Sequence, residues 1–457
     1  MDRVSNNPGP LELMIAKANS ILNLLRGNSD SSVSSRNAIL AFIIRVGSAG
    51  LAYLSQILLA RWMGSYEYGI YAYVWVWLLL LGGLSTIGLN TAVIRFIPEY
   101  TEKNQLDKLR GIIFQSRVIT LFVSTALMCI SFALLFLLKD YVESYVLLPA
   151  ILVLLCLPAY AITDLHDSMA RGYSWMNMAL IPPFLLRPLL ILLGMAGAYF
   201  YGLPLTAVTA ISVAVAATWL TSILQIIFLH PRIRREVPAG EKTKETKFWL
   251  LTAFPILLVE SFVLFLQNTD VLVLSQYHPP EDIAQYYAAL KTINLITFVH
   301  FAVANAVANR FSAYEARGDK ELLANFIRQS VKWTFWPSLG AAVLLLAMGK
   351  PLLWLFGPEF TNAYPVMFIL AVGLVIKSMF GPAEYVLNML GEQKICAFLL
   401  FLTALINIGL NFLLIPHYGL IGAASATALS LTLAALFFFI TVKVRLKINI
   451  FALGNKH

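Results

Sequence analysis

Eight ionisable side chains lie inside long apolar stretches of this sequence. They are Arg45, Arg117, Arg187, Glu260, Asp270, Lys291, Lys377 and Glu384. If these stretches cross a membrane, each charge costs roughly 3 kcal/mol or more unless it is paired or hydrated. The eight residues therefore predict either ion pairs or a water-filled cavity within the membrane.

Other polar residues follow most of these charges at helical spacing. The shared faces are Arg45 with Ser48, Ser55 and Gln56; Arg117 with Thr120, Ser124 and Ser131; Glu260 with Gln267 and Asp270; Lys291 with Asn294, Asn305 and Asn309; and Lys377 with Glu384 and Asn388. Polar faces inside a membrane are expected where helices line water, and not where they face lipid. Five cations against three carboxylates then predict a basic cavity.

Arg187 is the strongest candidate for contact with a substrate. It lies near the middle of a predicted span, within the proline-rich segment Pro182–Pro188. Proline interrupts the backbone hydrogen-bond ladder, and interrupted helices often form transporter sites. A guanidinium donates two parallel hydrogen bonds to phosphate oxygens. We therefore expect Arg187, together with the equally central Lys377, to hold an anionic head group.

Three further cations are candidates for the same cavity. Arg45 and Arg117 lie about six residues, roughly 9 Å, from the predicted cytoplasmic ends of their spans. They either line the cavity or extend to the membrane surface. Lys291 either lines the cavity or forms a structural ion pair with Asp270, which lies at similar depth on the preceding helix.

The carboxylates suggest ion coupling or pairing. Glu260 is a candidate site for H⁺ or Na⁺, because a carboxylate inside the membrane binds either ion. Asp270 and Glu384 are assigned to the same class, as coupling or pairing groups.

The composition shows which elements position these residues. The 457 residues are 59% hydrophobic and 12% charged, with a mean hydropathy of +0.76. A soluble protein would expose much of this apolar surface, whereas lipid covers it. Spans of about 20 residues are expected at 39–61, 69–94, 111–138, 145–166, 176–200, 205–229, 248–276, 283–310, 323–348, 362–388, 394–416 and 420–442. The predicted fold is therefore an all-α integral membrane protein with about twelve transmembrane helices.

The basic residues predict the orientation. With a cytoplasmic N-terminus, 25 of the 33 Lys and Arg residues fall on the cytoplasmic side and three outside. Cytoplasmic loops retain positive charge during insertion. We expect a multi-pass protein of the bacterial inner membrane, with both termini in the cytoplasm.

Two related halves are indicated by repeated segments. Tyr201-Gly202-Leu203 recurs as Tyr418-Gly419-Leu420, and Arg95-Phe96 recurs as Arg310-Phe311, at nearly equal offsets. Since six spans separate the copies, the halves have the same orientation, with a pseudo-two-fold axis along the membrane normal. The predicted domains are a cytoplasmic segment (1–37) with an interfacial helix or frayed tail at 11–26, a first lobe (38–229), a cytoplasmic link (230–247), a second lobe (248–442) and a cytoplasmic tail (443–457).

Several classes of function are disfavoured. The net charge of +9 does not indicate nucleic-acid binding, because the basic residues lie in short links without exposed aromatic neighbours. The three cysteines lack paired or metal-ligand spacing. No motif for a metal, a cofactor or a nucleophile is present. A membrane polysaccharide polymerase or ligase would need a large external loop, and the predicted external links are short.

Two groups of motifs resemble the bacterial O-antigen and exopolysaccharide flippases. Ala60–Tyr71 and Gly88–Phe96 are similar to the segments that follow the first span and end the second span in that family. Gly391–Lys394 and Leu414–Ala424, with Asn407 and Asn411 between them, are similar to its C-terminal region.

The family belongs to the multidrug/oligosaccharidyl-lipid/polysaccharide exporter superfamily. The resemblance implies two six-helix bundles in a V shape around a cationic cavity. It also implies that a polyprenyl-diphosphate-linked oligosaccharide moves from the cytoplasmic to the periplasmic leaflet, with H⁺ or Na⁺ as a coupling ion in several members. Membrane lipids and a polysaccharide polymerase or export machinery would be its partners. The alternatives are a drug/cation antiporter, whose cavity should be acidic, and a lipid II flippase, which usually has fourteen spans.

Overall fold

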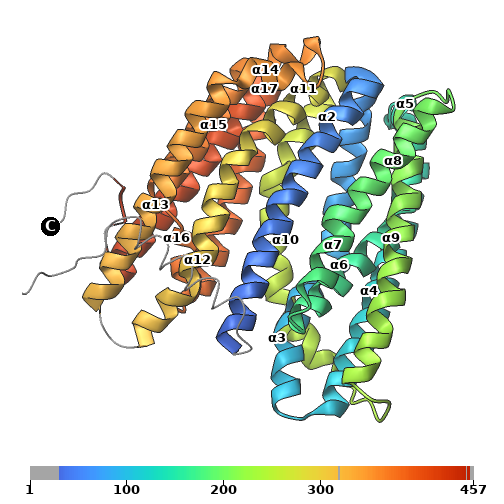
Figure 1. The fold of residues 1–457 in the computed structure, drawn as a ribbon. Coiled ribbons are helices and arrows are strands. Elements are labelled where there is room, and N and C mark those ends of the chain that lie inside the picture. The colour runs from blue at the N-terminus through green and yellow to red at the C-terminus, as the bar shows by residue number, and fades with distance from the viewer. Residues whose placement is uncertain (1–29, 317–319, 449, 453–457) are drawn as a thin grey trace, which may run out of the picture.

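The computed structural model describes residues 30–316, 320–448 and 450–452, and its regular elements there are all helical (Figure 1). The α-helices are α2 (Asp30–Ser85), α3 (Leu89–Glu102), α4 (Leu106–Leu137), α5 (Ser144–Leu154), α6 (Leu157–Gly172), α7 (Met176–Ile181), α8 (Arg187–Phe200), α9 (Ala207–Glu236), α10 (Thr246–Tyr277), α11 (Pro280–Ile293), α12 (Thr297–Ala316), α13 (Lys320–Ala347), α14 (Gly349–Trp354), α15 (Tyr364–Met379), α16 (Ala383–Met389) and α17 (Gln393–Leu446). Four short 3₁₀ or π turns join some of them: η1 (Lys139–Tyr141), η2 (Pro182–Leu186), η3 (Asn294–Ile296) and η4 (Pro358–Ala363). The interfacial helix predicted at 11–26 lies outside the described residues.

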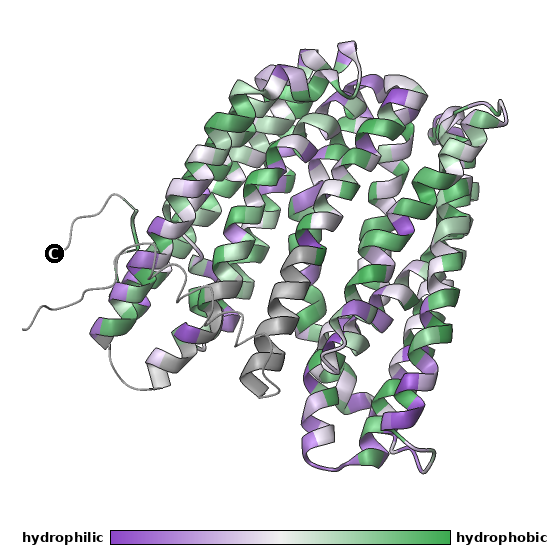
Figure 2. Ribbon diagram, in the orientation of Figure 1, coloured by the Kyte–Doolittle hydropathy of each residue, from purple (hydrophilic) through white to green (hydrophobic). Residues whose placement is uncertain are grey.

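The long helices are membrane spans. Among the described residues, nine helices are long and apolar enough to cross a membrane, or ten if α5 and α6, which meet at 45°, form one span. Their outer faces remain apolar, and the side chains of Phe122 and Phe136 on α4 are each 72% exposed. Lipid is the environment that such surfaces require. Figure 2 shows these long hydrophobic segments, with hydrophilic residues gathered at helix ends and at a few interior positions.

Helices α2 and α17 are each too long for one crossing. They have 56 and 54 residues, or about 80 Å of helix, whereas the hydrocarbon layer is about 30 Å thick. Each contains one glycine with non-helical angles, Gly64 (φ +76°) and Gly419 (φ +55°). Glycine adopts positive φ without a Cβ clash. Both glycines fall where the sequence predicts a link between two spans, and the total of twelve spans stays a prediction.

The repeated segments have related structures. Gly202 and Gly419, which correspond in the two copies, both have positive φ. Phe96 and Phe311, which also correspond, are both buried. The two halves therefore share local backbone and packing features as well as sequence.

The helices form two groups that meet at one end. In Figure 1, α3 to α9 lie on one side, α12 to α17 on the other, and α2 and α10 between them. At the end where α11 packs on α2, one apolar core includes residues of both groups, such as Met195 and Phe356. At the other end each group has its own core, around Phe96 in the first and Phe311 in the second. The molecule thus has a V shape that diverges toward the end carrying the basic links.

Part of the predicted link between the halves (230–247) is helical, because α9 continues to Glu236 and α10 begins at Thr246. Residues 237–245 between them are held on α4. Arg110 donates hydrogen bonds from Nε to the carbonyl oxygen of Pro238 (2.7 Å) and from Nη1 to that of Glu241 (3.3 Å). The backbone N–H of Thr243 donates to the carbonyl oxygen of Asp107 (3.1 Å). The link is therefore an ordered strap on the first half.

Candidate functional site

A cluster of charged and polar side chains lies where α3, α6 and α10 meet. The hydroxyl of Thr91 donates to Oε1 of Glu260 (2.5 Å), which joins α3 to α10. Nδ2 of Asn90 donates to Oδ2 of Asp164 (3.0 Å), which joins α3 to α6. Glu260 is thus held by a hydroxyl donor of α3, beside a second polar contact between α3 and α6.

Local backbone geometry brings α3 close to α10. Gly88 precedes α3 in the left-handed conformation (φ +71°), and a Cβ on it would lie 2.4 Å from the carbonyl oxygen of Ala253. Only glycine allows both the angle and the approach. Asn90 and Thr91 follow Gly88 by two and three residues. The close approach therefore places Asn90 at Asp164 and Thr91 at Glu260.

Helix α6 supplies an ion pair in the same region. Asp164, Asp167 and Arg171 follow one another at spacings of three and four residues, which places them on one helical face. Nη2 of Arg171 lies 2.6 Å from Oδ2 of Asp167, whose side chain is buried. Arg45 interacts electrostatically with both members of this pair. One of the predicted cavity cations therefore lies beside the cluster.

Arg45 also lies between the two halves. Its guanidinium carbon is 4.3 Å from the ring centre of Phe184 in the first half and 5.5 Å from that of Phe301 in the second. The residue is half-buried. Stacking on aromatic faces holds the guanidinium without neutralising its charge.

Arg187 approaches the cluster from the proline-rich segment. The segment forms the π-helical turn η2 between α7 and α8, and Arg187 is the first residue of α8. The interruption expected from the prolines is therefore present. The guanidinium carbon lies 4.9 Å from the ring centre of Tyr160 and 6.0 Å from that of Trp75. Arg187 also interacts electrostatically with Asp164.

Arg117 has different neighbours. It lies close enough to His166 and Tyr173 for electrostatic interaction. Its buried Nε and both ring nitrogens of His166 have no hydrogen-bond partner among the described residues. The contacts that we find do not connect Arg117 to the cluster around Glu260.

Asp270 and Lys291 do not form the expected ion pair, although the structure describes both. Asp270 instead accepts hydrogen bonds from the hydroxyls of Tyr286 (2.5 Å) and Thr427 (3.3 Å), and from the backbone N–H of Val271 (2.8 Å). Nζ of Lys291 lies 4.6 Å from the ring centre of Tyr287. Hydroxyl donors on adjacent helices satisfy the carboxylate, so no cation within ion-pair distance is needed.

Lys377 and Glu384 line one small pocket of about 60 Å³ within the second half, together with His300. The walls are otherwise apolar, apart from Thr403. The volume suits a few water molecules. The two charged residues therefore line one pocket, but they do so from separate helices, α15 and α16, and not from the single helical face that the sequence predicted. None of the residues of the cluster around Glu260 lines this pocket. Among the described residues, no group of His, Cys, Asp and Glu is arranged to hold a metal ion.

Sequence reasoning missed five members of the cluster: Asn90, Thr91, Asp164, Asp167 and Arg171. The predicted fourth span ended at residue 166, so Asp167 and Arg171 were treated as parts of a cytoplasmic link. Helix α6 continues to Gly172. The 164, 167, 171 spacing is the sequence signal that could have identified the cluster. The charges of the cluster and its neighbours are then three cations (Arg45, Arg171 and Arg187) and three carboxylates (Asp164, Asp167 and Glu260), a balanced set.

The helical spans, the V shape and the buried charges define a polytopic membrane protein of the transporter type. The profile of the family described as "Polysaccharide biosynthesis protein" matches residues 34–314, more than half of the chain, and a MatE profile matches residues 255–413. The chain belongs to the polysaccharide biosynthesis protein family, within the multidrug/oligosaccharidyl-lipid/polysaccharide exporter superfamily. The resemblance drawn from the sequence motifs is confirmed.

Two relatives of known sequence support this assignment. An uncharacterized membrane protein of Methanocaldococcus jannaschii, MJ1068, is 23% identical over 83% of this chain and 78% of its own length. A Haloferax volcanii protein named "Probable low-salt glycan biosynthesis flippase Agl15" is 25% identical over 35% of this chain. That second match spans about a third (34%) of the relative.

Solved structures confirm the fold. An inward-facing multidrug resistance MATE family transporter has a TM-score of 0.71 at 15% identity, with 89% of this chain and 98% of that chain covered. The lipid II flippase MurJ in an inward closed conformation has a TM-score of 0.70 at 17% identity, with coverage of 89% and 87%. The predicted MATE-like fold is therefore correct.

Proposed function

We propose that this protein is a flippase that moves a polyprenyl-diphosphate-linked oligosaccharide from the cytoplasmic to the periplasmic leaflet of the bacterial inner membrane. The observation that carries the proposal is the position of Arg45 and Arg187 within a chain of the polysaccharide biosynthesis protein family. Both lie inside the membrane region, and neither has an ion pair within 4 Å among the residues that the structure describes.

The two arginines supply what a diphosphate needs. Each guanidinium is positioned by aromatic rings and keeps donors for phosphate oxygens. Arg45 lies between the halves, where a cargo must pass if the lobes alternate in access. The proposal has both termini in the cytoplasm, lobes at 38–229 and 248–442, and a polymerase or export complex that receives the product.

Glu260 is the proposed coupling residue. The Glu260 carboxylate joins α10 to α3 by accepting a hydrogen bond from Thr91. Binding of H⁺ or Na⁺ to this carboxylate would therefore change the contact between α10 and α3. A Glu260→Gln variant should change the dependence of transport on pH or sodium. If that dependence stays unchanged, Glu260 is not the coupling site.

A drug/cation antiporter is the second candidate function. The balanced set of three cations and three carboxylates around Glu260 favours it more than the basic cavity expected from sequence did. The MatE profile match over residues 255–413 points the same way. A lipid II flippase is a third possibility within the same fold, and its cargo is also a diphosphate.

The proposed cargo is tested by replacing the chromosomal gene with an Arg45→Ala/Arg187→Ala variant. Loss of charged hydrogen bonds, each about 1.5–3 kcal/mol, should lower surface glycan at least tenfold and accumulate lipid-linked intermediates. Arg232→Ala is the matched control, because Arg232 also stacks on an aromatic ring (Trp175, 4.5 Å) but is exposed on α9. Normal glycan export by a well-expressed double variant would refute the proposed site. Lost resistance to cationic drugs with normal glycan export would instead support the antiporter.

A further inference from the structure

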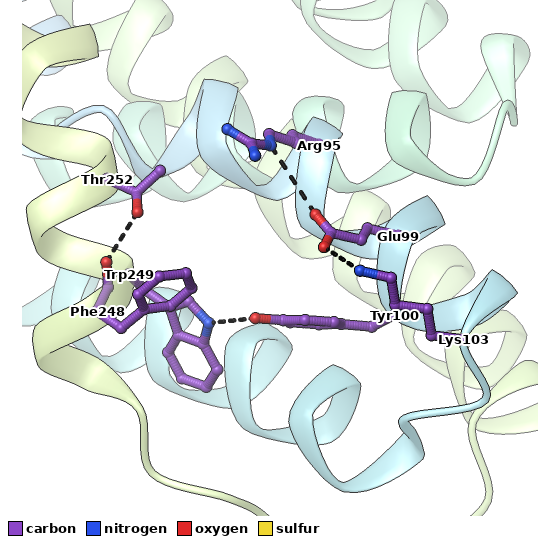
Figure 3. Close-up of polar contacts among 7 residues, drawn as sticks. All are labelled: Arg95, Glu99, Tyr100, Lys103, Phe248, Trp249 and Thr252. Carbon is purple, nitrogen blue, oxygen red and sulfur yellow. Dashed lines mark hydrogen bonds and ion pairs between the residues drawn. The ribbon is translucent and has the colours of Figure 1, made fainter.

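A separate pocket of about 760 Å³ opens at the end of the molecule that carries the basic links. It lies between α3, the start of α4, the strap and the first turns of α10. Its lining residues are Arg95, Phe96, Glu99, Tyr100, Lys103, Gln105, Lys108, Lys244, Glu245, Lys247, Phe248 and Leu251. Figure 3 shows part of this region. The pocket contains none of the residues of the proposed transport site.

The lining has an excess of positive charge: five Lys and Arg residues against two carboxylates. Glu99 forms an ion pair with Nζ of Lys103 (2.7 Å) and a longer one with Nε of Arg95 (3.9 Å) (Figure 3). The hydrogen bond from Lys103 lowers the pKa of Glu99, so its carboxylate is ionised at neutral pH. Lys244 and Lys247 are exposed and form no ion pair with a described residue.

The other pair in the pocket leaves these two lysines unneutralised. Nζ of Lys108 lies 2.8 Å from Oε1 of Glu245, the remaining carboxylate of the lining. Both carboxylates thus have cation partners of their own. The unpaired Lys244 and Lys247 therefore give the pocket a net positive charge, which attracts anions.

Aromatic rings form the inner wall. The rings of Phe96 and Tyr100 stack with centres 5.5 Å apart, and Phe248 lies 5.8 Å from Phe96. The indole N–H of Trp249 donates to the hydroxyl of Tyr100 (3.0 Å), which fixes that ring (Figure 3). The pocket is therefore amphipathic, with an apolar wall and a cationic rim.

The apolar edge continues onto the lipid-facing surface. Phe248 and Leu251 lie in the first two turns of the spanning helix α10, and their side chains are 53% and 65% exposed. A free inorganic anion would contact the cationic rim but gain nothing from this edge. A phospholipid would contact both surfaces. Its phosphate lies at the membrane boundary, beside the cationic rim, and its acyl chains lie beside the apolar edge of α10.

We propose that this pocket binds the head group of an anionic phospholipid from the surrounding membrane. Lys244 and Lys247 contact the phosphate, and the acyl chains run along Phe248 and Leu251. Since the lining includes α3, the strap and α10, the bound lipid holds the start of α10 against the first half. This role does not depend on which cargo the protein moves.

The test uses the full chain in detergent, with native mass spectrometry to measure binding of phosphatidylglycerol and of phosphatidylcholine. Phosphatidylglycerol should bind more tightly. A Lys244→Gln/Lys247→Gln variant should lose about fivefold in affinity for each lysine removed, since each lysine at an anionic surface contributes roughly that factor. Glu99→Gln should tighten binding, because it releases Lys103 and Arg95.

The matched control is Lys394→Gln/Lys443→Gln. It removes two exposed lysines from the same end of the molecule, outside the pocket, and should change affinity less than twofold. Equal binding of the two lipids, or equal losses in the two double variants, would overturn the proposal. So would displacement of phosphatidylglycerol by millimolar inorganic phosphate, because that result identifies a site for a free anion.

Discussion

Replacement of Gly69 by alanine should open the contact between α2 and α11. A Cβ at Gly69 would lie 1.8 Å from the carbonyl oxygen of Pro280 and 2.5 Å from its carbonyl carbon. An ordinary contact needs more than 3 Å, so the first turn of α11 must move by over 1 Å. Backbone atoms cannot avoid the methyl group by changing a rotamer. Overpacking of this kind costs about 1–3 kcal/mol.

This cost acts on the end where both halves share one core. If the halves separate there during transport, a penalty of about 2 kcal/mol on the closed contact shifts the equilibrium toward the separated state roughly 30-fold. Spin labels at Lys139 and Lys350, which are exposed near that end, would report the change by pulsed electron paramagnetic resonance. The distance distribution should broaden and move to longer values in Gly69→Ala.

Gly47→Ala is the control for this prediction. Gly47 lies in the same helix, and a Cβ there meets no atom within 4 Å. Alanine favours helix over glycine by about 1 kcal/mol, so this variant should be as stable as the wild type or more so. An unchanged distance distribution in Gly69→Ala would refute the argument that the α2–α11 contact closes this end.

Two further predictions concern stability. Gly88→Ala should lower the melting temperature of the purified protein much more than Gly64→Ala: both glycines have positive φ, but a Cβ at Gly88 also meets the carbonyl oxygen of Ala253 at 2.4 Å, whereas one at Gly64 meets nothing within 4 Å. Similar losses in the two variants would contradict this. Tyr286→Phe should cost about 1–3 kcal/mol, because it removes the 2.5 Å hydrogen bond to the buried Asp270; a melting temperature equal to the wild type's would show that the carboxylate does not need this donor.

Much of the fold could be predicted from the sequence, because lipid imposes a simple requirement on span length and polarity. The repeat containing Gly202 and Gly419 was also visible in the sequence, whereas the positive φ that both glycines share is a finding of the structure. The number of spans is harder to derive. Helices α2 and α17 each continue through a glycine at a predicted link between two spans, so the helix boundaries of the structure do not by themselves give the number of spans.

The candidate site was only partly predictable. Nearness in sequence grouped Lys377 with Glu384, and both line one pocket, although the helix is interrupted between them. It could not show that Thr91 hydrogen-bonds to Glu260, because that contact joins residues 169 positions apart. It also could not show that Asp270 takes its donors from Tyr286 and Thr427. Such hydrogen-bond pairings depend on tertiary packing and cannot be read from the 3.6-residue period of a single helix.

The course of α10 limits how the two halves can be exchanged between relatives. Trp249 and Ala253 pack in the core of the first half, whereas Val259 and Val263 pack against that of the second. Val271 and Leu274 belong to the shared core. A chimaera joined within residues 237–245 would therefore combine a foreign α10 with the native α3 surface that receives it. The two halves are therefore not independent modules, and a recombination point after Pro255 should give a better-folded hybrid than one in the strap.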